Sequence, residues 1–324
     1  GSITIPAKAI LNFAQYNSDA EVLLETLEGT QLRCTSKHAK TMIAGEAASE
    51  YPTIASVERQ TSLVLEAEPL LEALHLVTFA SAKSSLRPVL SGVLFQRIGA
   101  SLTLVTTDSY RLSEYTLKTK EKGEEISCII PTKILDELRS IIGSSLKKVS
   151  PQDGGGKEEP KGAIKVPEIS LFLSKQQIEV HAGNVRLLSR LIDGKFPDYR
   201  QILPKDGKTN ALFAAHEFST AVKRMHYFAK EMNNNLTFHV AKGQVKMSTP
   251  QTQIGRDEAV LAAEVAGDEN KIALSSSYLL DFLGHIHTDN VLMKVTDSLH
   301  PAVFTLPENP RYLHLIMPLR MQEE

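Results

Sequence analysis

The sequence contains no tryptophan, and aromatic residues make up only 6% of its 324 residues. Proteins that bind single-stranded nucleic acid commonly stack the bases on several aromatic side chains. The scarcity of such side chains argues against a base-stacking platform of that kind. Cysteine is also rare: the sequence has two, Cys34 and Cys128, and both lie in apolar, strand-like runs. We expect them to be buried, reduced core residues rather than a disulfide.

Long apolar runs and a targeting segment are missing as well. No run approaches the roughly 20 apolar residues that a membrane-spanning helix needs, and the first residues lack the basic and apolar regions of a secretion signal. We therefore expect a cytoplasmic protein without a membrane partner. A hydrophobic content of 42% and a charged content of 23% are ordinary for a globular protein. The length allows two or three domains.

The sequence also has no strong excess of charge of one sign. Its formal net charge is −2 at pH 7. This value argues against nonspecific nucleic-acid binding by the whole surface, and it is compatible with a basic face balanced by an acidic one.

What the sequence does contain is a pattern that recurs five times: an apolar strand, a few turn-like residues and an amphipathic helix. The strands begin at residues 3, 63, 128, 211 and 272, which gives spacings of 60, 65, 83 and 61 residues. The long interval holds a polar insert at 150–165, which we expect to be a mobile surface loop. Without this insert the period is nearly constant, and it is too long for a solenoid repeat. The strands and helix starts are Ile3–Ile5 with Ala9–Phe13, Leu63–Leu65 with Leu70–Leu74, Cys128–Ile130 with Ile134–Leu138, Ala211–Phe213 with Phe218–Val222, and Ile272–Leu274 with Tyr278–Leu283.

Between these starts the residues alternate between apolar and polar, as in Val22–Leu27, Leu236–Val240 and Val291–Val295. A period of two is typical of strands with one buried face. Each unit is therefore predicted to hold one helix and three or four antiparallel strands. The pattern indicates an α+β fold of repeated βαβββ units, which is a symmetric scaffold rather than a single-site enzyme.

The ends of the units indicate how they pair. An aromatic–proline step, Tyr51-Pro52 and Phe196-Pro197, precedes the second and the fourth unit. We therefore expect the second and third repeats to form one domain and the fourth and fifth repeats another, with boundaries near 58–61 and 204–210. The first repeat is then the second half of a domain whose first half is absent. The predicted domains are 1–60 (incomplete), 61–205 and 206–324.

Four stretches, in the right order along the repeats, resemble the signature sequences of one family. They are Arg87–Phe95, Thr106–Leu112, Leu191–Arg200 and Leu315–Met321. From Ile3 to Met321 the chain resembles the bacterial sliding clamps, the beta subunits of DNA polymerase III. The resemblance implies a head-to-tail homodimeric ring with helices around the hole and antiparallel sheets outside. It also implies a non-enzymatic function without a cofactor: encircling duplex DNA and tethering the polymerase III alpha subunit, the clamp loader and other proteins with a clamp-binding motif. Such a protein associates with the bacterial nucleoid during replication.

Several features depart from the family pattern. The first half of the first domain is absent, the polar insert is longer than usual, and Gln322–Glu324 extend past the usual end. The family often has Gly-His where this chain has Ser109-Tyr110, and often Arg where it has Gln201. These changes alter the expected shape and charge of the pocket rim.

Basic residues on or beside the repeat helices are the candidates for DNA contact. The apolar stripe of each helix must face the sheet, so these cations point away from the core. Placed around a hole, they attract phosphates without reading bases, and the attraction weakens with salt. An ordinary solvated helix face has the same composition. The residues are Lys8, Lys83, Lys133, Arg139, Lys223 and Arg224.

By resemblance, a pocket for a partner peptide lies between the second and third domains. Its members are mostly apolar with a few polar groups, as expected of a groove that takes a short peptide. Some of them, such as Leu112, Leu315 and Met317, could equally be core strand residues. The set is Arg87, Leu90, Thr107, Tyr110, Arg111, Leu112, Pro197, Ile202, Ser275, Tyr278, Leu299, Leu315, Met317, Pro318, Leu319, Arg320 and Met321.

The resemblance also implies a subunit interface, in which an edge strand with Thr41 and Ile43 meets Tyr227 and Phe228 of another subunit. The two aromatic residues could equally belong to the core.

Catalytic interpretations find little support. The pair His285 and His287 has no cysteine or carboxylate cluster near it in the sequence, and no phosphate-binding Gly-Lys-Ser/Thr loop occurs. We expect no metal site. Two alternatives stay open beside the clamp: a DNA-repair accessory enzyme, and a protein-interaction scaffold that does not bind DNA.

Overall fold

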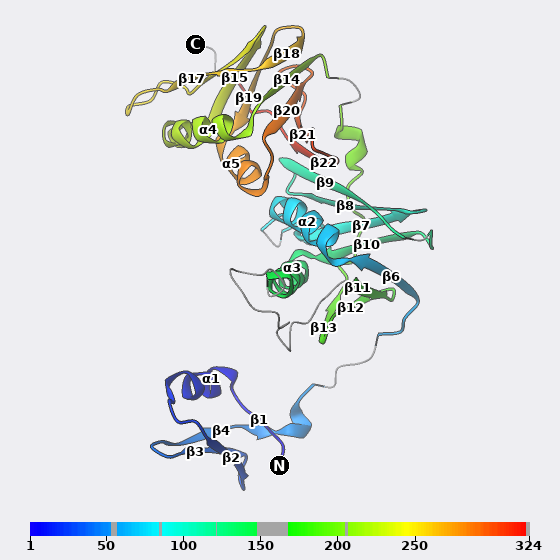
Figure 1. Ribbon diagram of the computed structural model, residues 1–324, viewed down its shortest axis with the longest axis vertical. Helices are drawn as coiled ribbons and strands as arrows, with labels where there is room; N and C mark the ends of the chain where they lie inside the picture. The colour runs from blue at the N-terminus through cyan, green and yellow to red at the C-terminus, as the bar shows by residue number, and fades with distance from the viewer. Residues whose placement is uncertain (53–56, 84–85, 121, 148–167, 205–206, 322–324) are drawn as a thin grey trace, which may run out of the picture. The chain divides into compact units, whose positions relative to one another are not determined.

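The computed structural model describes residues 1–52, 57–83, 86–120, 122–147, 168–204 and 207–321. The polar insert at 150–165 and the tail Gln322–Glu324 lie outside the described residues. The chain divides into two compact units, Gly1–Ser56 and Val57–Glu324, which we call unit 1 and unit 2 (Figure 1). Both domains expected over 61–205 and 206–324 lie in unit 2, and their boundaries stay predictions.

Unit 1 holds one helix and a three-stranded antiparallel sheet in the order β2-β3-β4, while β1 pairs with β5. Its core is small: Leu32, Cys34 and Ile43 pack against side chains from β1 and α1. No residue of α1 is fully buried, and Leu23 and Leu24 on β2 are exposed. The elements are β1 (Ile3–Thr4), α1 (Ala7–Tyr16), β2 (Val22–Leu27), β3 (Gln31–Ser36), β4 (Lys40–Ala44), β5 (Glu46–Ala47) and a 3-10 helix at Ala48–Glu50.

Unit 2 contains the other four strand–helix starts. In each, the helix begins directly after the strand, and the predicted repeat of strand and helix is confirmed. The four pairs are β6 (Thr61–Glu66) with α2 (Ala67–Val77), β10 (Ile126–Pro131) with α3 (Thr132–Lys147), β14 (Thr209–Ala214) with α4 (Ala215–Ala229), and β19 (Asn270–Ser275) with α5 (Ser276–His285).

The remaining strands of unit 2 follow these starts in sets of three or four. Short 3-10 helices lie at Thr78–Ala80, Pro88–Ser91, Tyr199–Ile202 and Lys230–Met232. The strands are β7 (Gly92–Ile98), β8 (Ser101–Thr107), β9 (Arg111–Lys118), β11 (Glu168–Leu173), β12 (Gln177–Ala182), β13 (Val185–Arg190), β15 (Asn235–Ala241), β16 (Gln244–Ser248), β17 (Glu258–Ala262), β18 (Glu264–Gly267), β20 (Asn290–Val295), β21 (Ala302–Leu306) and β22 (Asn309–Ile316).

In unit 2 the first strand of each repeat pairs antiparallel with a strand of the neighbouring repeat: β6 with β11, β10 with β7, β14 with β20, and β19 with β15. On its other side, β14 also pairs with β18 of its own repeat. This exchange of strands links neighbouring repeats. It is a tertiary arrangement that the sequence pattern did not indicate.

A single nine-stranded sheet runs across the two halves of unit 2 in the order β10-β7-β8-β9-β22-β21-β20-β14-β18. The joint is the antiparallel pair of β9 and β22, whose register runs from Tyr115 opposite Tyr312 to Arg111 opposite Ile316. Two four-stranded sheets, β13-β12-β11-β6 and β17-β16-β15-β19, complete unit 2 among its described residues.

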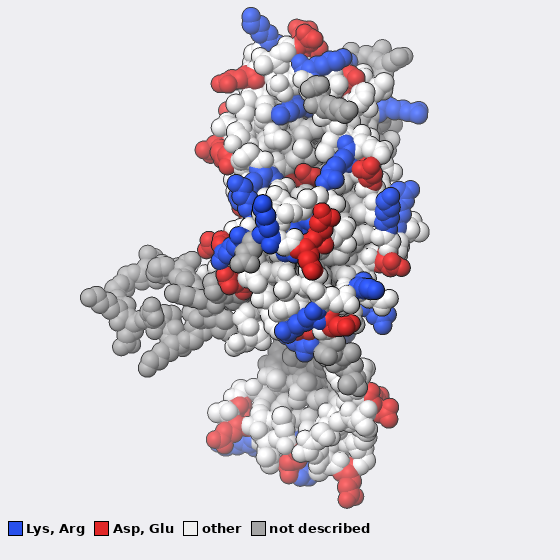
Figure 2. All heavy atoms as spheres, turned by 90° about the vertical axis from the view of Figure 1, so that its right-hand side faces the viewer, with Lys and Arg blue, Asp and Glu red and all other residues white. Residues whose placement is uncertain are grey.

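The main core lies between these sheets and the helices. In α2 the buried residues Leu70, Ala73, Leu74 and Val77 recur at the spacing of one helix face, and they pack against strand residues such as Phe95. Figure 1 shows α2, α3, α4 and α5 along the same side of unit 2. Figure 2 shows the side of unit 2 that lies to the right in Figure 1, where cationic and anionic side chains are interspersed.

Both cysteines are free, as expected; Cys34 is buried and Cys128 only half-buried. Burial raises the pKa of the Cys128 thiol to about 12. Among the described residues, no helix is both long and apolar enough to cross a membrane.

Replacing Phe304 with Ala should destabilise unit 2 strongly. The ring is fully buried, and its centroid lies 5.2 Å from that of Phe282 and 6.4 Å from that of Phe218. We expect a loss of about 3–5 kcal/mol in the free energy of unfolding, measured with guanidinium. The control is Thr305→Ala, the next residue on β21, which is half-buried and should lose less than about 1 kcal/mol. Equal losses would contradict a core centred on these rings.

Candidate functional site

A second apolar cluster lies on the face of the nine-stranded sheet opposite the helices. Its members alternate with those of the main core along each strand, as Leu94 does with Phe95 and Val105 with Leu104. Neighbouring residues of a strand point to opposite faces, so the two clusters lie on the two sides of the sheet. The second cluster consists of Leu94, Val105, Leu112, Ile129, Phe196, Tyr199, Val303 and Leu315, with Val89, Ile192, Leu203, Leu313 and Met317 packed against it.

This second cluster brings together residues from all four signature stretches, and several of them belong to the expected peptide pocket. Leu112 and Leu315 are opposite each other across β9 and β22 and are fully buried. They lie below the surface, so they can support a pocket but not line it. Leu90, Thr107 and Ser275 are also buried.

Several apolar side chains of the expected pocket are exposed to solvent. Leu299 is 82% exposed, Tyr110 61%, Ile202 41% and Met321 38%. Met317, the first residue after β22, is half-buried. Of the other expected residues, Pro197, Arg87 and Arg320 are exposed, and Tyr278, Pro318 and Leu319 are half-buried.

Hydrogen bonds fix the chain segment that follows β22. The backbone N–H of Met317 donates to the carbonyl of Tyr110 (2.8 Å), and that of Leu319 donates to the carbonyl of Ala273 (2.7 Å). The side-chain amide of Asn235 donates to the carbonyl of Arg320 (3.1 Å). The C-terminal segment therefore joins the loop before β9 to the sheet that contains β19.

The loop at 108–110 has an unusual backbone. Ser109 adopts φ +82°, in the left-handed region that residues with a Cβ rarely occupy. Asp108 Oδ1 accepts hydrogen bonds from the N–H groups of Tyr110 (2.9 Å) and Arg111 (3.0 Å). Thr107 Oγ1 accepts one from the N–H of Ser109 (3.1 Å). These side-chain acceptors hold the turn in place of a glycine.

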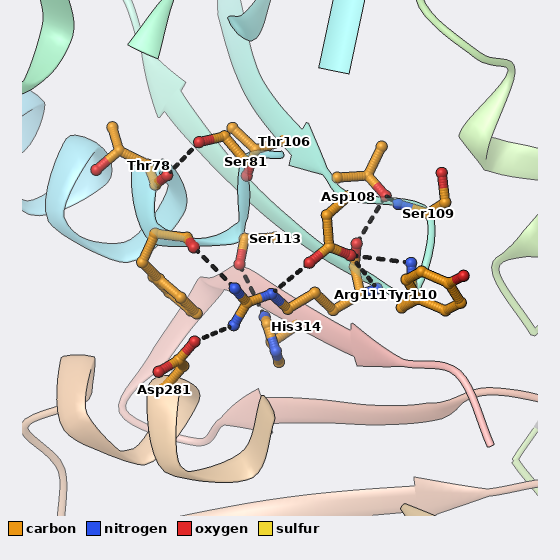
Figure 3. A network of polar contacts seen from close by, with 12 residues as sticks. Thr78, Ser81, Thr106, Asp108, Ser109, Tyr110, Arg111, Ser113, Asp281 and His314 are labelled. Carbon is orange, nitrogen blue, oxygen red and sulfur yellow. Dashed lines mark hydrogen bonds and ion pairs between the residues drawn. The ribbon is translucent and has the colours of Figure 1, made fainter. Parts of the chain in front are cut away.

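Arg111 lies at the centre of this network (Figure 3). Its side chain is only 5% exposed. The guanidinium donates from Nε to Asp108 Oδ2 (3.0 Å), from Nη1 to Asp281 Oδ2 (2.7 Å) and from Nη2 to the carbonyl of Phe79 (3.2 Å). It also lies 4.8 Å from the ring centroid of Tyr278. These three hydrogen bonds hold the Arg111 guanidinium inside unit 2.

The buried His314 on β22 belongs to the same region. Burial, with Arg111 nearby, holds the pKa of His314 well below its usual range, so the ring is neutral. Its Nδ1 lies 2.8 Å from the hydroxyl of Ser113 on β9 (Figure 3). This contact adds a side-chain link to the backbone pairing of the two strands.

The candidate DNA-contact residues differ in solvent exposure and in whether they form ion pairs within the protein. Lys133 on α3, Lys223 on α4, Lys8 on α1 and Lys83 after α2 are exposed. The side chains of these four lysines are therefore open to solvent.

Two of the expected cations are engaged elsewhere. Arg139 is half-buried and pairs with Asp136 (3.4 Å). Arg224 binds both oxygens of Asp257 (2.8 and 3.1 Å), which raises the pKa of its guanidinium. These partners, which the sequence did not indicate, neutralise part of the helix-side charge.

The expected interface residues lie on an edge strand of unit 1 and near the end of a helix of unit 2. In unit 1, β4 is an edge strand, and Ile43 is buried in the core while its neighbour Met42 is exposed. Ile43 therefore packs inward, because alternate residues of a strand face opposite sides; Thr41 is half-buried. In unit 2, Tyr227 is 66% exposed at the end of α4, whereas Phe228 is half-buried near Gly255.

A metal site finds no support within the part of the chain that the structure describes. No group of three or more His, Cys, Asp or Glu residues there is arranged to hold an ion. His285 and His287 lie near His75, with ring centroids 5.0 and 5.9 Å from it.

Some residues of this site were missed in the sequence. Asp108 lies inside a signature stretch, but no role was assigned to it, and Asp281 is one polar residue on an amphipathic helix. The two carboxylates meet at Arg111 only through the fold, so no local pattern could have paired them. No sequence pattern indicates that the backbone carbonyl of Phe79 accepts a hydrogen bond from Arg111.

Comparison with known proteins identifies the family. The model of the DNA polymerase III beta subunit central domain matches residues 64–154, and that of the C-terminal domain matches residues 200–320. Together these stretches make up about two thirds of the chain. The beta sliding clamp of Staphylococcus epidermidis is 27% identical over 322 residues, covering 99% of this chain and 80% of the relative. That of Staphylococcus aureus is 28% identical with the same coverage.

Solved structures agree with these matches. The DNA polymerase sliding clamp of Bacillus subtilis has a TM-score of 0.86 and 25% identity, covering 99% of this chain and 80% of that one. A Pseudomonas aeruginosa sliding clamp, solved bound to griselimycin, has a TM-score of 0.83 and 24% identity, covering 99% of this chain and 82% of that one. The chain therefore belongs to the family of bacterial DNA polymerase III beta subunits, the beta sliding clamps, which are non-catalytic processivity subunits of that polymerase.

Proposed function

We propose that this chain encircles duplex DNA as a sliding clamp and tethers replication and repair proteins through a peptide pocket. One observation carries the proposal: four repeat helices share one side of unit 2, while one sheet continues unbroken across its two halves. A ring built from such units has helices around a hole and a wall outside. A protein that is held on DNA by topology needs only weak contacts with it.

The DNA contact is sequence-independent. Lys133 and Lys223 are exposed on α3 and α4 and supply charge that attracts phosphates without reading bases. Lys8 and Lys83 add to this charge. Arg139 and Arg224 contribute less, because each is already paired with a carboxylate. Contacts of this kind are screened by salt and let the ring slide.

The partner pocket lies over the second cluster, bordered by Tyr110, Ile202, Leu299, Met317 and Met321. Exposed apolar side chains around a rigid floor suit the apolar end of a short peptide. The half-buried methionine gives the pocket an adaptable wall, as a site with several partners needs. The griselimycin-bound clamp of Pseudomonas aeruginosa supports a ligand pocket in this fold. The partners are the polymerase III alpha subunit, the clamp loader and other proteins with a clamp-binding motif.

The ring is a head-to-tail homodimer. Two edge strands, β4 in unit 1 and β17 in unit 2, carry unpaired backbone groups on one side. Exposed edges call for a partner strand. We propose that β4 of one subunit pairs with β17 of the other, next to the exposed Tyr227. Met42, rather than Ile43, supplies the apolar contact from β4. In the cell such a clamp works in the cytoplasm, on the nucleoid during replication.

Replacing Met317 with Asp should weaken binding of a short synthetic peptide ending in Leu-Phe. The change places an unpaired charge in an apolar groove, so we expect about a tenfold or greater rise in Kd by calorimetry. The control is Ile98→Asp, the same kind of change at an exposed residue at the end of β7. Unchanged binding in the Met317 variant would contradict the pocket assignment.

In a double variant, both Lys133 and Lys223 are replaced with Glu. We expect this variant to stay on nicked circular duplex DNA for about one tenth of the time of the parent chain at low salt. The matched control reverses two exposed strand lysines, Lys118 on β9 and Lys271 on β19, and changes the net charge equally. Their parity along the strands places them on the sheet face away from the main core. Equal loss in both double variants would show that total charge, not the helix side, determines retention. No retention of the parent chain on circular DNA would contradict the clamp proposal itself.

Replacing Tyr227 with Glu should shift the chain from dimer to monomer at micromolar concentration. A buried aromatic residue at an interface often dominates its affinity, so we expect at least about a tenfold weaker dimer by sedimentation. Ile98→Glu serves as the control for an added surface charge. An unaltered mass would exclude the end of α4 from the interface.

A further inference from the structure

Arg111 connects three parts of unit 2 that are far apart in the sequence. Its guanidinium contacts the carboxylate of Asp108 in its own loop, that of Asp281 on α5, and the carbonyl of Phe79 after α2 (Figure 3). Asp281 lies on the far side of the β9–β22 joint from the loop. A guanidinium offers several donors in a fixed plane, so it can hold these acceptors in one geometry.

The loop that Arg111 holds is strained. Ser109 has a Cβ and φ +82°, which costs energy that the surroundings must offset. Asp108 offsets it by accepting the N–H groups of Tyr110 and Arg111 with one oxygen. Its other oxygen is held by the Arg111 guanidinium. The turn therefore depends on Asp108, and the orientation of Asp108 depends on Arg111.

The same loop determines where the pocket wall lies. The carbonyl of Tyr110 accepts the N–H of Met317, which is the first residue after β22. The exposed ring of Tyr110 lies roughly parallel to that of Tyr278, with centroids 6.4 Å apart. A shift of the loop would therefore move Tyr110 and release Met317, the two residues that border the proposed pocket.

We infer that Arg111 is a positioning residue for the partner-peptide pocket, which it holds open by anchoring the 108–110 loop to Asp281 on α5. It does not touch the peptide, because its side chain is 5% exposed and its donors are engaged within the protein. Peptide affinity is thereby coupled to the β9–β22 joint. This inference rests on the proposed pocket function.

The joint contains a second polar network that provides a control. Glu72 on α2 accepts hydrogen bonds from the hydroxyl of Tyr115 on β9 (2.9 Å) and the amide of Asn309 on β22 (2.6 Å). Arg311 pairs with the same carboxylate (3.3 Å). This network also spans the joint, but it has no contact with the 108–110 loop. Arg311→Gln therefore weakens the joint and leaves the anchor of the loop intact.

The test compares Asp281→Ala and Arg111→Lys with Arg311→Gln in the whole chain. Asp281→Ala removes one anchor, and Arg111→Lys keeps the charge but loses the planar fork. We expect both to raise the Kd of the Leu-Phe peptide about three- to tenfold, and Arg311→Gln to change it less than about twofold. Melting temperatures of all three variants show whether a change in Kd merely follows a loss of stability.

A second measurement does not need the peptide. In the free protein, the amides of Tyr110, Arg111 and Met317 should exchange with deuterium about tenfold faster in Asp281→Ala than in the parent chain. Arg311→Gln should leave their exchange unchanged. Unaltered exchange in Asp281→Ala would overturn the inference even if the peptide binds. If the parent chain fails to bind the peptide while the exchange rates change as expected, the proposed pocket fails and the anchoring role stands.

Ser109→Gly provides the rescue. Glycine adopts a positive φ without strain, so the loop needs its anchor less. Asp281→Ala raises log Kd relative to the parent chain. In the double variant Ser109→Gly with Asp281→Ala, we expect at least half of this rise in log Kd to be reversed. No recovery, with faster exchange persisting at Tyr110 and Arg111, would show that Asp281 acts on the pocket by another route.

Discussion

The backbone pairing of β9 with β22 is the constraint on which the rest of unit 2 depends. It joins a four-stranded sheet, β10-β7-β8-β9, and a five-stranded sheet, β22-β21-β20-β14-β18, into one nine-stranded sheet. One face of that sheet packs under the helices, and the other carries the second cluster. Leu112 and Leu315, which face each other across this pair, are buried in the second cluster. If the register slipped by one residue, both faces would exchange their side chains.

Side chains secure the same joint at two places. Arg111 with its two carboxylates lies at one end, and Glu72 with Tyr115, Asn309 and Arg311 at the other. The Arg111 guanidinium is buried, and a buried charge without partners is costly, so removing one of its carboxylates leaves it partly uncompensated. Such networks favour one arrangement of the two halves over other compact ones.

The distribution of charge agrees with binding that is weak and unspecific. Two of the expected helix-side cations, Arg139 and Arg224, are neutralised by Asp136 and Asp257. Exposed lysines such as Lys133 and Lys223 remain on that side. Strong phosphate binding would oppose sliding, whereas a closed ring stays on DNA without it. The second cluster and the main core lie on opposite faces of the nine-stranded sheet.

The sequence by itself determined the five strand–helix starts and the α+β repeat, because apolar periodicity is local and each start carries its own pattern. The clamp family followed from four short stretches, such as Thr106–Leu112. Only the tertiary structure decided that β6 pairs with β11, that Arg224 meets Asp257, and that the Arg111 side chain is buried against Asp108 and Asp281. It also decided that Ile43 packs inward while Met42 faces out. Pairing between distant segments depends on which surfaces bury each other and on where a charge finds a partner, and no local pattern contains that information.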